Sequence, residues 1–448
     1  MTKKSIFNSE DSLSEIERLN RTSKTVNWSP QEGFNFELVI PQTVYPPRED
    51  TDMLAKRLIS IGPGRGKKIL EVGCGSGAIS ILASYLGWKV SCCDVNPFAV
   101  AATIGNLDLN RLEGVVKEGG IGPEKFPFES KYDLIVWNLP YIPLAEVDQL
   151  LGPMEEASLL DTDDVGLGNR LLKTVERNQL LSPKGRILTL GRDTNFNFSD
   201  FSNRKWDEIR FDDGEKLVIT CHWKPFEGQD SIFKERTGST NDDLMEKTGV
   251  GTHFHTSWQD SGRGRRDRTW TSIEGGYAGS WIIREGNDFN PGMLQLSAGL
   301  AVLKTVDDKR LKLKWPNDII LEERKLCGIL VEGKTSGNMT KVILGIGVNL
   351  NCKENQNLEY ASLDEIQVFG HEEFDSKLHR NLASLLEQGV NLPPLRHDDI
   401  RYEVLEQMKR FGLPEHNNVT YDSFELNDRG QLVLGGMIID DGEDVFWN

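Results

Sequence analysis

Short apolar runs alternate with helical patterns in the first half of the chain, as in a sheet of parallel strands joined by helices. Apolar runs at 68–72, 89–93 and 132–138 predict three of the strands, and residues 78–86 predict an apolar helix after the first. Residues 206–223 alternate around a central turn and predict a closing antiparallel hairpin. These patterns favour an α/β, doubly wound, Rossmann-like domain.

The second half of the chain follows a different pattern. Residues 292–306 predict a buried apolar helix, and residues 371–412 carry apolar positions at helical spacing. A hairpin is expected after Trp315, with its turn at 322–325. The segment 418–448 alternates as short strands do. We therefore expect an α+β domain that ends in a small β cap.

These patterns also predict the domain boundaries, and a length of 448 residues suits about three domains. The chain opens with polar residues rich in Ser, Asn, Glu and Lys, which predict a flexible arm. The expected division is a flexible arm at 1–30, a first domain at 31–225, a linker at 226–231, a second domain at 232–412 and a cap at 413–448.

Composition narrows the class of protein. Apolar residues make up 38% of the chain and charged residues 27%, as in globular domains with cores of their own. A formal net charge of -17 argues against a DNA-binding protein, which needs a basic surface. The chain has no apolar run long enough to span a membrane, no apolar leader, and no C-x-x-C pair among its six cysteines. A cytoplasmic protein without DNA or membrane partners is the expectation.

A glycine-rich turn follows the first of the predicted strands and opens the helix behind it. Gly73, Gly75 and Gly77 occur there in the sequence Gly-Cys-Gly-Ser-Gly. Glycines at such a turn let a nucleoside ligand approach the backbone and the helix terminus. The next strand ends in Asp94, whose carboxylate is placed to accept hydrogen bonds from both ribose hydroxyls. Up to this point an NAD site would look similar.

The strand at 132–138 ends in Asn138-Leu139-Pro140-Tyr141, which separates these alternatives. The nitrogen of an amide or an aromatic amine is a poor nucleophile, because its lone pair is conjugated. An Asn side-chain oxygen and the next backbone carbonyl can accept both of its N–H bonds and turn the lone pair toward a methyl group. Tyr141 can stack on the planar group. The segment resembles the Asn-x-Pro-Tyr signature of S-adenosylmethionine-dependent methyltransferases, which implies methylation of a planar nitrogen, either an adenine amine or a glutamine amide.

These motifs, with Pro46 to Thr51, resemble the HemK family of protein glutamine methyltransferases across residues 34–225. The family usually has Pro where Leu139 stands and Gly-Asp near Gly119. The resemblance implies S-adenosylmethionine as cofactor, a release-factor Gly-Gly-Gln loop as substrate, and a small zinc-binding activator subunit as partner. The implied cofactor-binding residues are Glu71, Gly73, Gly75, Gly77, Asp94 and Asn138. Asn138 and Tyr141 are the implied catalytic residues, and Asn138, Leu139, Pro140 and Tyr141 the implied acceptor site.

Residues 262–270, Gly-Arg-Gly-Arg-Arg-Asp-Arg-Thr-Trp, set four arginines among two glycines. A solvated loop in so acidic a chain has no need of this much positive charge. Guanidiniums provide forked donors for phosphate oxygens, glycines allow close backbone approach, and Trp270 offers a flat face for a ring. The loop predicts a site that closes over a phosphorylated ligand. A basic turn packed against acidic neighbours is the alternative.

Four further stretches, at 237–241, 314–318, 325–332 and 344–349, complete a resemblance to BirA-type biotin protein ligases over residues 232–448. The resemblance implies a class II synthetase-like fold with an SH3-like cap. Lys314 and Arg265 are the implied catalytic residues. The implied biotin- and ATP-binding residues are Ser239, Thr240, Asn241, Gln259, Gly262, Arg263, Arg265, Arg266, Trp270, Lys314, Asn317, Gly328, Ile329 and Asn349. Asp267 stands where the family has glycine, and we expect it to alter the ordering of the loop.

The second resemblance implies a two-step reaction. The carboxylate of biotin attacks the α-phosphorus of ATP, with magnesium on the triphosphate, and the biotinyl-5′-AMP formed gives its biotin to a lysine of a biotin-accepting carrier protein. No protein nucleophile is needed, so catalysis is positioning and charge stabilisation. Lys314 would stabilise the α-phosphate, and Arg263 and Arg265 would hold biotin and phosphate.

A bifunctional methyltransferase and biotin ligase is therefore the leading hypothesis. The first half could instead be a binding or scaffolding module, or a nucleic-acid adenine methyltransferase, although no basic target surface is evident. A biotin-sensing regulator is disfavoured because the chain shows no helix-turn-helix. His253 and His255 share one face of a strand, but no Cys or carboxylate pattern joins them, so no metal site is expected.

Overall fold

The computed structural model describes residues 23–121, 126–140, 142–143, 160–161, 166–192, 196, 200–211, 214, 216–266, 268–286, 289–336, 339–352, 359–440 and 442–447. The chain divides into two compact units, Met1–Lys224 and Pro225–Asn448. Among the described residues, no helix has both the length and the apolar character that a membrane span requires.

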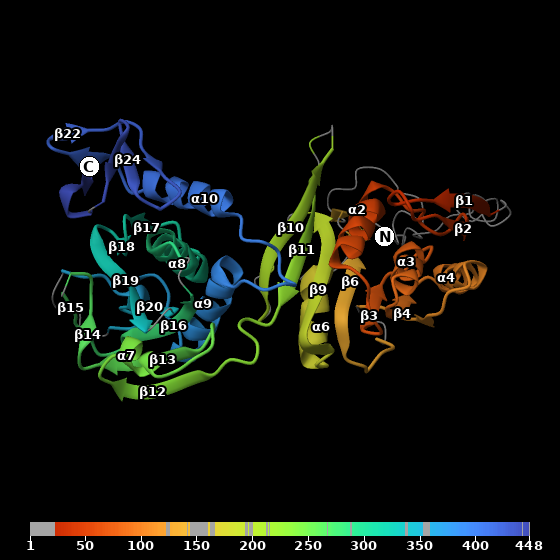
Figure 1. Cartoon of the computed structure of the whole chain (residues 1–448), viewed down its shortest axis with the longest axis horizontal. Helices are drawn as coiled ribbons and strands as arrows, with labels where there is room; N and C mark the ends of the chain where they lie inside the picture. Colours follow the sequence, from red (N-terminus) through yellow and green to blue (C-terminus); the bar gives the residue numbers. More distant parts are fainter. Residues whose placement is uncertain are drawn as a thin grey trace, which may run out of the picture. The chain divides into compact units, whose positions relative to one another are not determined.

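The N-terminal unit is built on a seven-stranded sheet with the strand order β10-β11-β9-β6-β3-β4-β5 (Figure 1). The strands from β9 to β5 pair in parallel, and β11 runs antiparallel to both β9 and β10. This is a doubly wound sheet closed by an antiparallel hairpin, as the apolar pattern predicts. Its elements are β1 (Lys24–Trp28), β2 (Phe36–Ile40), α2 (Glu49–Ile61), β3 (Lys68–Val72), α3 (Ala78–Tyr85), β4 (Lys89–Asp94), α4 (Pro97–Leu109), β5 (Val115–Glu118), β6 (Tyr132–Asn138), β7 (Ile142–Pro143), β8 (Leu160–Asp161), α6 (Leu167–Arg177), β9 (Leu181–Arg192), β10 (Ser202–Arg210) and β11 (Lys216–Trp223).

Helices cover both faces of this sheet. Trp137 of β6 belongs to an apolar cluster with Leu171 and Leu172 of α6. On the other face, Glu71 of β3 accepts a hydrogen bond from Ser80 of α3. Strands buried on both faces carry continuous apolar runs, which is why the central strands were visible in the sequence.

Strand β1 corrects the expected extent of the flexible arm. The arm was expected to reach residue 30, but Lys24–Trp28 pairs antiparallel with Phe36–Ile40. Trp28 and Phe36 are buried with ring centroids 5.9 Å apart. Trp28 also donates a hydrogen bond to Asp52 at 2.7 Å. A single buried aromatic ring orders this segment, and a polar average composition conceals such a contact. Residues 1–22 lie outside the described residues.

The C-terminal unit contains a second seven-stranded sheet, in the order β12-β13-β16-β20-β19-β18-β17. Its strands pair antiparallel except for β12 with β13. Its elements are β12 (Ser231–Thr237), α7 (Thr240–Met245), β13 (His253–Gln259), β14 (Gly262–Arg263), β15 (Thr269–Trp270), β16 (Tyr277–Glu285), α8 (Pro291–Val306), β17 (Leu311–Lys314), β18 (Asp318–Leu321), β19 (Arg324–Ser336), β20 (Met339–Val348), η2 (Leu363–Glu365), α9 (His371–Leu386), α10 (His397–Lys409), β21 (Pro414–His416), β22 (Val419–Thr420), β23 (Glu425–Leu426), β24 (Leu432–Leu434), β25 (Met437–Ile439), η3 (Gly442–Asp444) and β26 (Phe446–Trp447).

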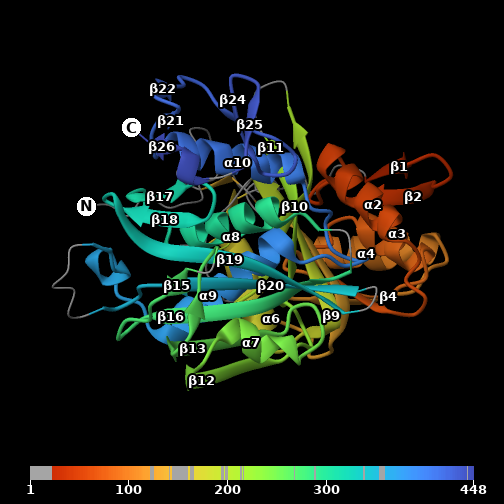
Figure 2. The same cartoon turned by 60° about the vertical axis from the view of Figure 1, so that its left-hand side comes forward.

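Neighbouring residues of β16 define the two faces of this sheet. Ser280 donates hydrogen bonds to Thr240 and Asn241 of α7, whereas Trp281 donates to His379 of α9. Since successive strand residues point to opposite faces, α7 and α9 lie on opposite sides. Helix α8 packs beside α9 along β17, β18 and β19 (Figures 1 and 2).

The expected helical stretch at 371–412 is two helices, α9 and α10. Pro393 and Pro394 lie between them, and proline lacks the backbone N–H that a continuous helix needs. After α10 come two three-stranded sheets, β22-β21-β26 and β23-β24-β25. Leu432 and Leu434 of β24 share one apolar cluster with Met408 of α10. The C-terminal strands therefore continue the core of this unit.

Candidate active sites

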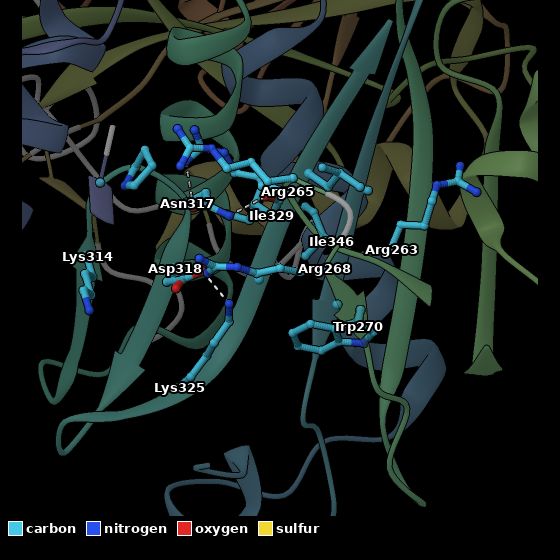
Figure 3. A pocket seen from close by; sticks show the side chains of 18 of the residues that line it. Arg263, Arg265, Arg268, Trp270, Lys314, Asn317, Asp318, Lys325, Ile329 and Ile346 are labelled. Carbon is cyan, nitrogen blue, oxygen red and sulfur yellow. Dashed lines mark hydrogen bonds and ion pairs between the residues drawn. The ribbon is translucent and has the colours of Figure 1, made fainter. Parts of the chain in front are cut away.

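A pocket of about 810 Å³ opens in the C-terminal unit, within the size range of small-molecule sites (Figure 3). It is bounded by the central strands, the arginine-rich loop and the C-terminal cap. Most of the predicted biotin and ATP residues line it: Ser239, Thr240, Asn241, Gln259, Arg263, Arg265, Arg266, Trp270, Lys314, Asn317, Gly328 and Ile329. Gly262 and Asn349 are not among the lining residues.

The arginine-rich loop is a small hairpin. Its strands β14 and β15 pair Gly262 with Trp270 and Arg263 with Thr269. A Cβ atom at Gly262 would lie 2.5 Å from the Trp270 carbonyl oxygen, so only glycine lets the two strands approach. Gly262 therefore supplies the close backbone approach on which the hairpin depends. Asp267, expected to alter the ordering of the loop, lies outside the described residues.

Arg263 is held by two carboxylates. Its terminal nitrogens donate to Asp242 at 2.7 and 2.9 Å, and its Nε and Nη2 donate to Glu332, each at 3.0 Å. Asp242 and Glu332 raise the pKa of Arg263, and Arg263 lowers the pKa of Asp242. Figure 3 shows its side chain extending away from Lys314 and Arg265. Here Arg263 anchors the first strand of the loop, in contrast to its expected contact with biotin and phosphate.

The remaining arginines of the loop lie closer to Asn317 and to the C-terminal segment. Arg265 approaches the Oδ1 atom of Asn317 at 3.4 Å, and Asn317 donates to the Ile329 carbonyl at 2.9 Å. Arg266 lies 3.5 Å from the carboxylate of Glu443 in η3, and Arg268 pairs with the same carboxylate. The sequence had assigned no role to Arg268 or Glu443, because their pairing joins segments 175 residues apart in number.

Three lysines line the pocket, Lys312 and Lys314 of β17 and Lys325 of β19. Lys325 of β19 forms an ion pair with Asp318 of β18 at 2.7 Å. Lys314 ends β17 and also lines the pocket, and its ammonium forms no ion pair with any carboxylate in the described part of the chain. Of the pocket lysines, Lys312 and Lys314 are thus not engaged by a carboxylate of the described residues.

The indole of Trp270 rests on the backbone of the central strands. A Cβ atom at Gly347 of β20 would lie 2.4 Å from the ring, and one at Gly328 of β19 would lie 2.9 Å from it. The ammonium of Lys325 lies 5.9 Å from the ring centroid. The two glycines leave the space in which the indole packs flat against the strands, so that Trp270 itself lines the pocket there.

A polar network lines the pocket where α7 begins. Ser239 is the N-cap residue of α7, as expected, although its side chain makes no capping hydrogen bond. The side-chain oxygen of Gln259 accepts from the Thr240 backbone at 2.9 Å and from its hydroxyl at 3.0 Å. The Oδ1 atom of Asn241 accepts from Ser280 at 2.5 Å. These side chains are oriented before any ligand arrives.

Asn349 has a structural role. It is buried at the end of β20 and donates a hydrogen bond to the Ala361 carbonyl at 2.9 Å. Its amide therefore ties β20 to the segment before η2. No local pattern in the sequence distinguishes such an asparagine from a ligand contact.

In the N-terminal unit the glycine turn has the backbone that its composition requires. Gly73, Gly75 and Gly77 have φ angles of 65°, 52° and 82°, the left-handed region that favours glycine. A Cβ atom at Gly77 would lie 2.9 Å from Thr103 of α4. The turn therefore opens toward the carboxyl edge of the sheet, where ligands bind in doubly wound folds.

Asp94 and Glu71, two of the expected cofactor-binding residues, have different hydrogen-bond partners. Asp94 accepts hydrogen bonds from the backbone N–H groups of Gly75 and Asn96, each at 2.9 Å, and burial raises its pKa. Asp94, at the end of β4, therefore links that strand to the glycine turn. The ribose contact expected for its carboxylate stays a prediction. The carboxylate of Glu71 is buried and bonded to Ser80, and burial raises its pKa well above the usual value.

Asn138 lies at the end of β6, beside the glycine turn that follows β3. Its Nδ2 atom donates to Asp50 Oδ2 at 2.8 Å, and its Oδ1 atom is buried without a hydrogen-bond partner in the described part of the chain. The side chain of Leu139 is buried, and its backbone N–H donates to the Leu190 carbonyl at 2.8 Å. Tyr141 lies outside the described residues. The sequence predicted no role for Asp50 beyond that of a possible helix cap, since 88 positions separate it from Asn138. The N-cap residue of α2 is Arg48.

The two histidines of β13 belong to a buried histidine cluster, defined here as His253, His255, His371, His379 and Asp375. The rings of His253 and His255 stack with centroids 5.0 Å apart and planes at 10°. Burial lowers the pKa of His255 and of His379 to about 4. No group of three or more His, Cys, Asp or Glu residues that could hold a metal ion occurs among the described residues.

Two family models match the chain in separate places. The biotin/lipoate A/B protein ligase family matches residues 234–349, and the ribosomal protein L11 methyltransferase (PrmA) family matches residues 53–155. Each match falls within one of the two compact units.

Three relatives illustrate the likeness. A biotin--[acetyl-CoA-carboxylase] ligase of Mycobacterium tuberculosis is 30% identical over 221 residues, which cover 44% of this chain and 80% of that protein. The bifunctional ligase/repressor BirA of Escherichia coli is 37% identical over 123 residues, 25% of this chain and 38% of that protein. A putative protein N5-glutamine methyltransferase of Methanocaldococcus jannaschii is 33% identical over 118 residues, 25% of this chain and 55% of that protein.

The chain spans only 38% to 52% of the length of several other biotin ligases that it matches. The mycobacterial ligase, in contrast, is covered over four fifths of its length. The pocket, the arginine-rich hairpin and the family match lie in the same unit. The chain belongs to the biotin protein ligase family, and its N-terminal unit is a methyltransferase domain.

Proposed function

We propose that the C-terminal unit joins biotin to ATP, forming biotinyl-5′-AMP and pyrophosphate, and then passes biotin to a lysine of a carrier protein. The observation that carries this proposal is one pocket that combines an unpaired lysine, a hairpin of arginines and an indole packed flat on two glycines. Such a site offers cationic groups for phosphate and a dry slot for an uncharged bicyclic ring.

The residues divide between positioning and charge stabilisation. Lys314 and Arg265 would meet the charge that grows on the α-phosphate during attack by the biotin carboxylate. The network of Thr240, Asn241 and Gln259 offers oriented polar groups to the head of biotin. Trp270 and the glycines beneath it would hold a planar ring. Magnesium would arrive on the triphosphate.

Biotin-dependent exchange of pyrophosphate into ATP tests this proposal. Wild type should catalyse the exchange, and Lys314→Ala should reduce it about 100-fold or more, because one charged contact to a transition state is lost. Lys309→Ala is the matched control, since Lys309 is exposed near the start of the same strand and does not line the pocket. A folded wild type without exchange would exclude the ligase assignment.

We further propose that the N-terminal unit is an S-adenosylmethionine-dependent methyltransferase acting on a protein amide. The glycine turn, Asp94 and the unpartnered Oδ1 atom of Asn138 meet at one edge of the sheet, which suits a nucleoside cofactor beside an N–H donor. The cofactor would supply an electrophilic methyl group. The Gly-Gly-Gln loop of a release factor and a small zinc-binding activator are the proposed partners.

Calorimetry with S-adenosylmethionine tests the cofactor, with Asp94→Asn expected to weaken binding at least tenfold because the Asp94 carboxylate holds the backbone of the glycine turn. Methylation of a Gly-Gly-Gln peptide, compared with an adenine-containing oligonucleotide, tests the acceptor. Binding without transfer to either would favour a scaffolding role. We also propose a cytoplasmic location, the domain boundaries expected from the sequence beyond the corrected N-terminal arm, and an SH3-like cap at 413–448. The cap is supported by its two small antiparallel sheets.

A further inference from the structure

We infer that Asp50 is a positioning residue that fixes which end of the Asn138 amide faces the methyl acceptor. This inference rests on the proposed methyltransferase function of the N-terminal unit. It assigns a role to a carboxylate that neither the motifs nor the family matches single out.

Asp50 is held in place before it meets Asn138. It lies in the first turn of α2 and is 4% exposed. Its Oδ1 atom accepts from the Thr51 backbone N–H at 2.7 Å and lies 3.3 Å from the Thr51 hydroxyl. That leaves Oδ2 to accept from Asn138 Nδ2 at 2.8 Å. The carboxylate therefore presents one fixed acceptor to the asparagine.

The chemistry of the pair decides the direction of the amide. A side-chain amide has a donor end and an acceptor end of nearly equal shape, so packing alone does not orient it. A carboxylate only accepts hydrogen bonds, so it selects the NH2 end of Asn138. The Oδ1 atom is consequently turned to the opposite side, where it is buried without a partner in the described part of the chain.

An acceptor left in this state has a free-energy cost, which a hydrogen bond from a ligand N–H would remove. The orientation thus selects a methyl acceptor that donates hydrogen bonds, such as a primary amide or amine. An acceptor oxygen that lacks a proton would face Oδ1 as a like dipole. Asp50 contributes to the choice of substrate without touching it.

The test compares Asp50→Asn with Glu49→Gln, which removes an exposed carboxylate from the same helical turn. Asp50→Asn can accept or donate, so it no longer selects one end of the amide. We expect it to bind S-adenosylmethionine within twofold of wild type while kcat for a Gly-Gly-Gln peptide falls at least tenfold. Glu49→Gln should match wild type in both. Equal losses of cofactor affinity, thermal stability and kcat in Asp50→Asn would show a merely structural role and overturn the inference.

A spectroscopic measurement separates this inference from the proposed function. In protein labelled with ¹⁵N-asparagine, the side-chain amide of Asn138 is assigned with Asn138→Asp, and its resonances should move in Asp50→Asn but not in Glu49→Gln. If wild type binds no cofactor or methylates no peptide, the proposed function fails, and the resonances still decide the orientation. Unmoved Asn138 resonances in Asp50→Asn would overturn the inference whatever the activity.

Discussion

The guanidinium of Arg263 donates two parallel hydrogen bonds to the carboxylate of Asp242, at 2.7 and 2.9 Å. The fork-to-fork geometry ties the hairpin of arginines to α7, the helix that opens beside the pocket. An arginine whose donors are engaged in this way stabilises the hairpin, while Lys314 and Arg265 line the pocket.

The first prediction concerns this anchor. Arg263→Met removes two partly exposed ion pairs, which together contribute up to about 1 kcal/mol to the stability of the C-terminal unit. In a domain of this size the loss should lower the thermal midpoint by about 2–4 °C. Arg268→Met, which removes a more exposed arginine from the same hairpin, should change the midpoint less. If Arg263→Met left the midpoint unchanged and weakened biotin or ATP binding about 100-fold, the ligand contact expected from the sequence would be correct.

The second prediction concerns the glycines against which Trp270 packs. Gly347→Ala should reduce pyrophosphate exchange about tenfold or more in a folded protein, since its Cβ would lie 2.4 Å from the Trp270 ring and displace it. Gly333→Ala on the neighbouring strand β19 is the control, because its Cβ would lie 3.5 Å from Thr340 of β20, an ordinary contact distance. Intrinsic tryptophan fluorescence should report the displacement. Equal exchange in the two variants would contradict a role for the indole in the site.

The third prediction concerns the contact between hairpin and cap. Glu443→Gln should strengthen ATP binding about two- to fivefold at low salt, because Arg266 and Arg268 lose a competing carboxylate. The gain should shrink at high salt as the charges are screened. Titration of ATP by calorimetry at two ionic strengths measures both effects. Weaker binding in Glu443→Gln would show instead that the cap must hold the hairpin for ATP to bind.

The fourth prediction concerns the histidine cluster and pH. The folded pKa of His255 and of His379 is about 4, below the usual histidine value near 6.5, because both rings are buried. The unfolded chain therefore binds more protons between these values. Their contribution to stability is full above pH 6.5 and is lost as pH falls toward 4, at up to about 1.4 kcal/mol per pH unit for each histidine.

Urea unfolding of wild type, His255→Gln and His397→Gln between pH 7.5 and 4.5 measures this dependence. His255→Gln should lower the slope of stability against pH by up to one proton. His397 is exposed at the start of α10, so its variant should keep the wild-type slope. Identical slopes in all three proteins would mean that His255 titrates normally in the folded state.

Much of both sites follows from local sequence. Three glycines in a row of five residues have the positive φ angles that a ligand-binding turn needs. The apolar run ending in Asn138 is a central strand, and the glycine at the start of the arginine-rich loop allows its hairpin to close. These features depend on backbone conformation and on burial of both strand faces, which short segments of sequence encode directly.

The direction of particular side chains depends on partners that are remote along the chain. Whether Asn138 turns its oxygen toward the site depends on Asp50, and whether Arg263 meets ligand or carboxylate depends on Asp242 and Glu332. Asn349 proved structural for the same reason. The tertiary fold decides which donors and acceptors lie within about 3 Å of each other. The local sequence around each residue does not predict these contacts. The sequence therefore indicated which chemical groups each site contains, whereas the tertiary structure decided how those groups are oriented.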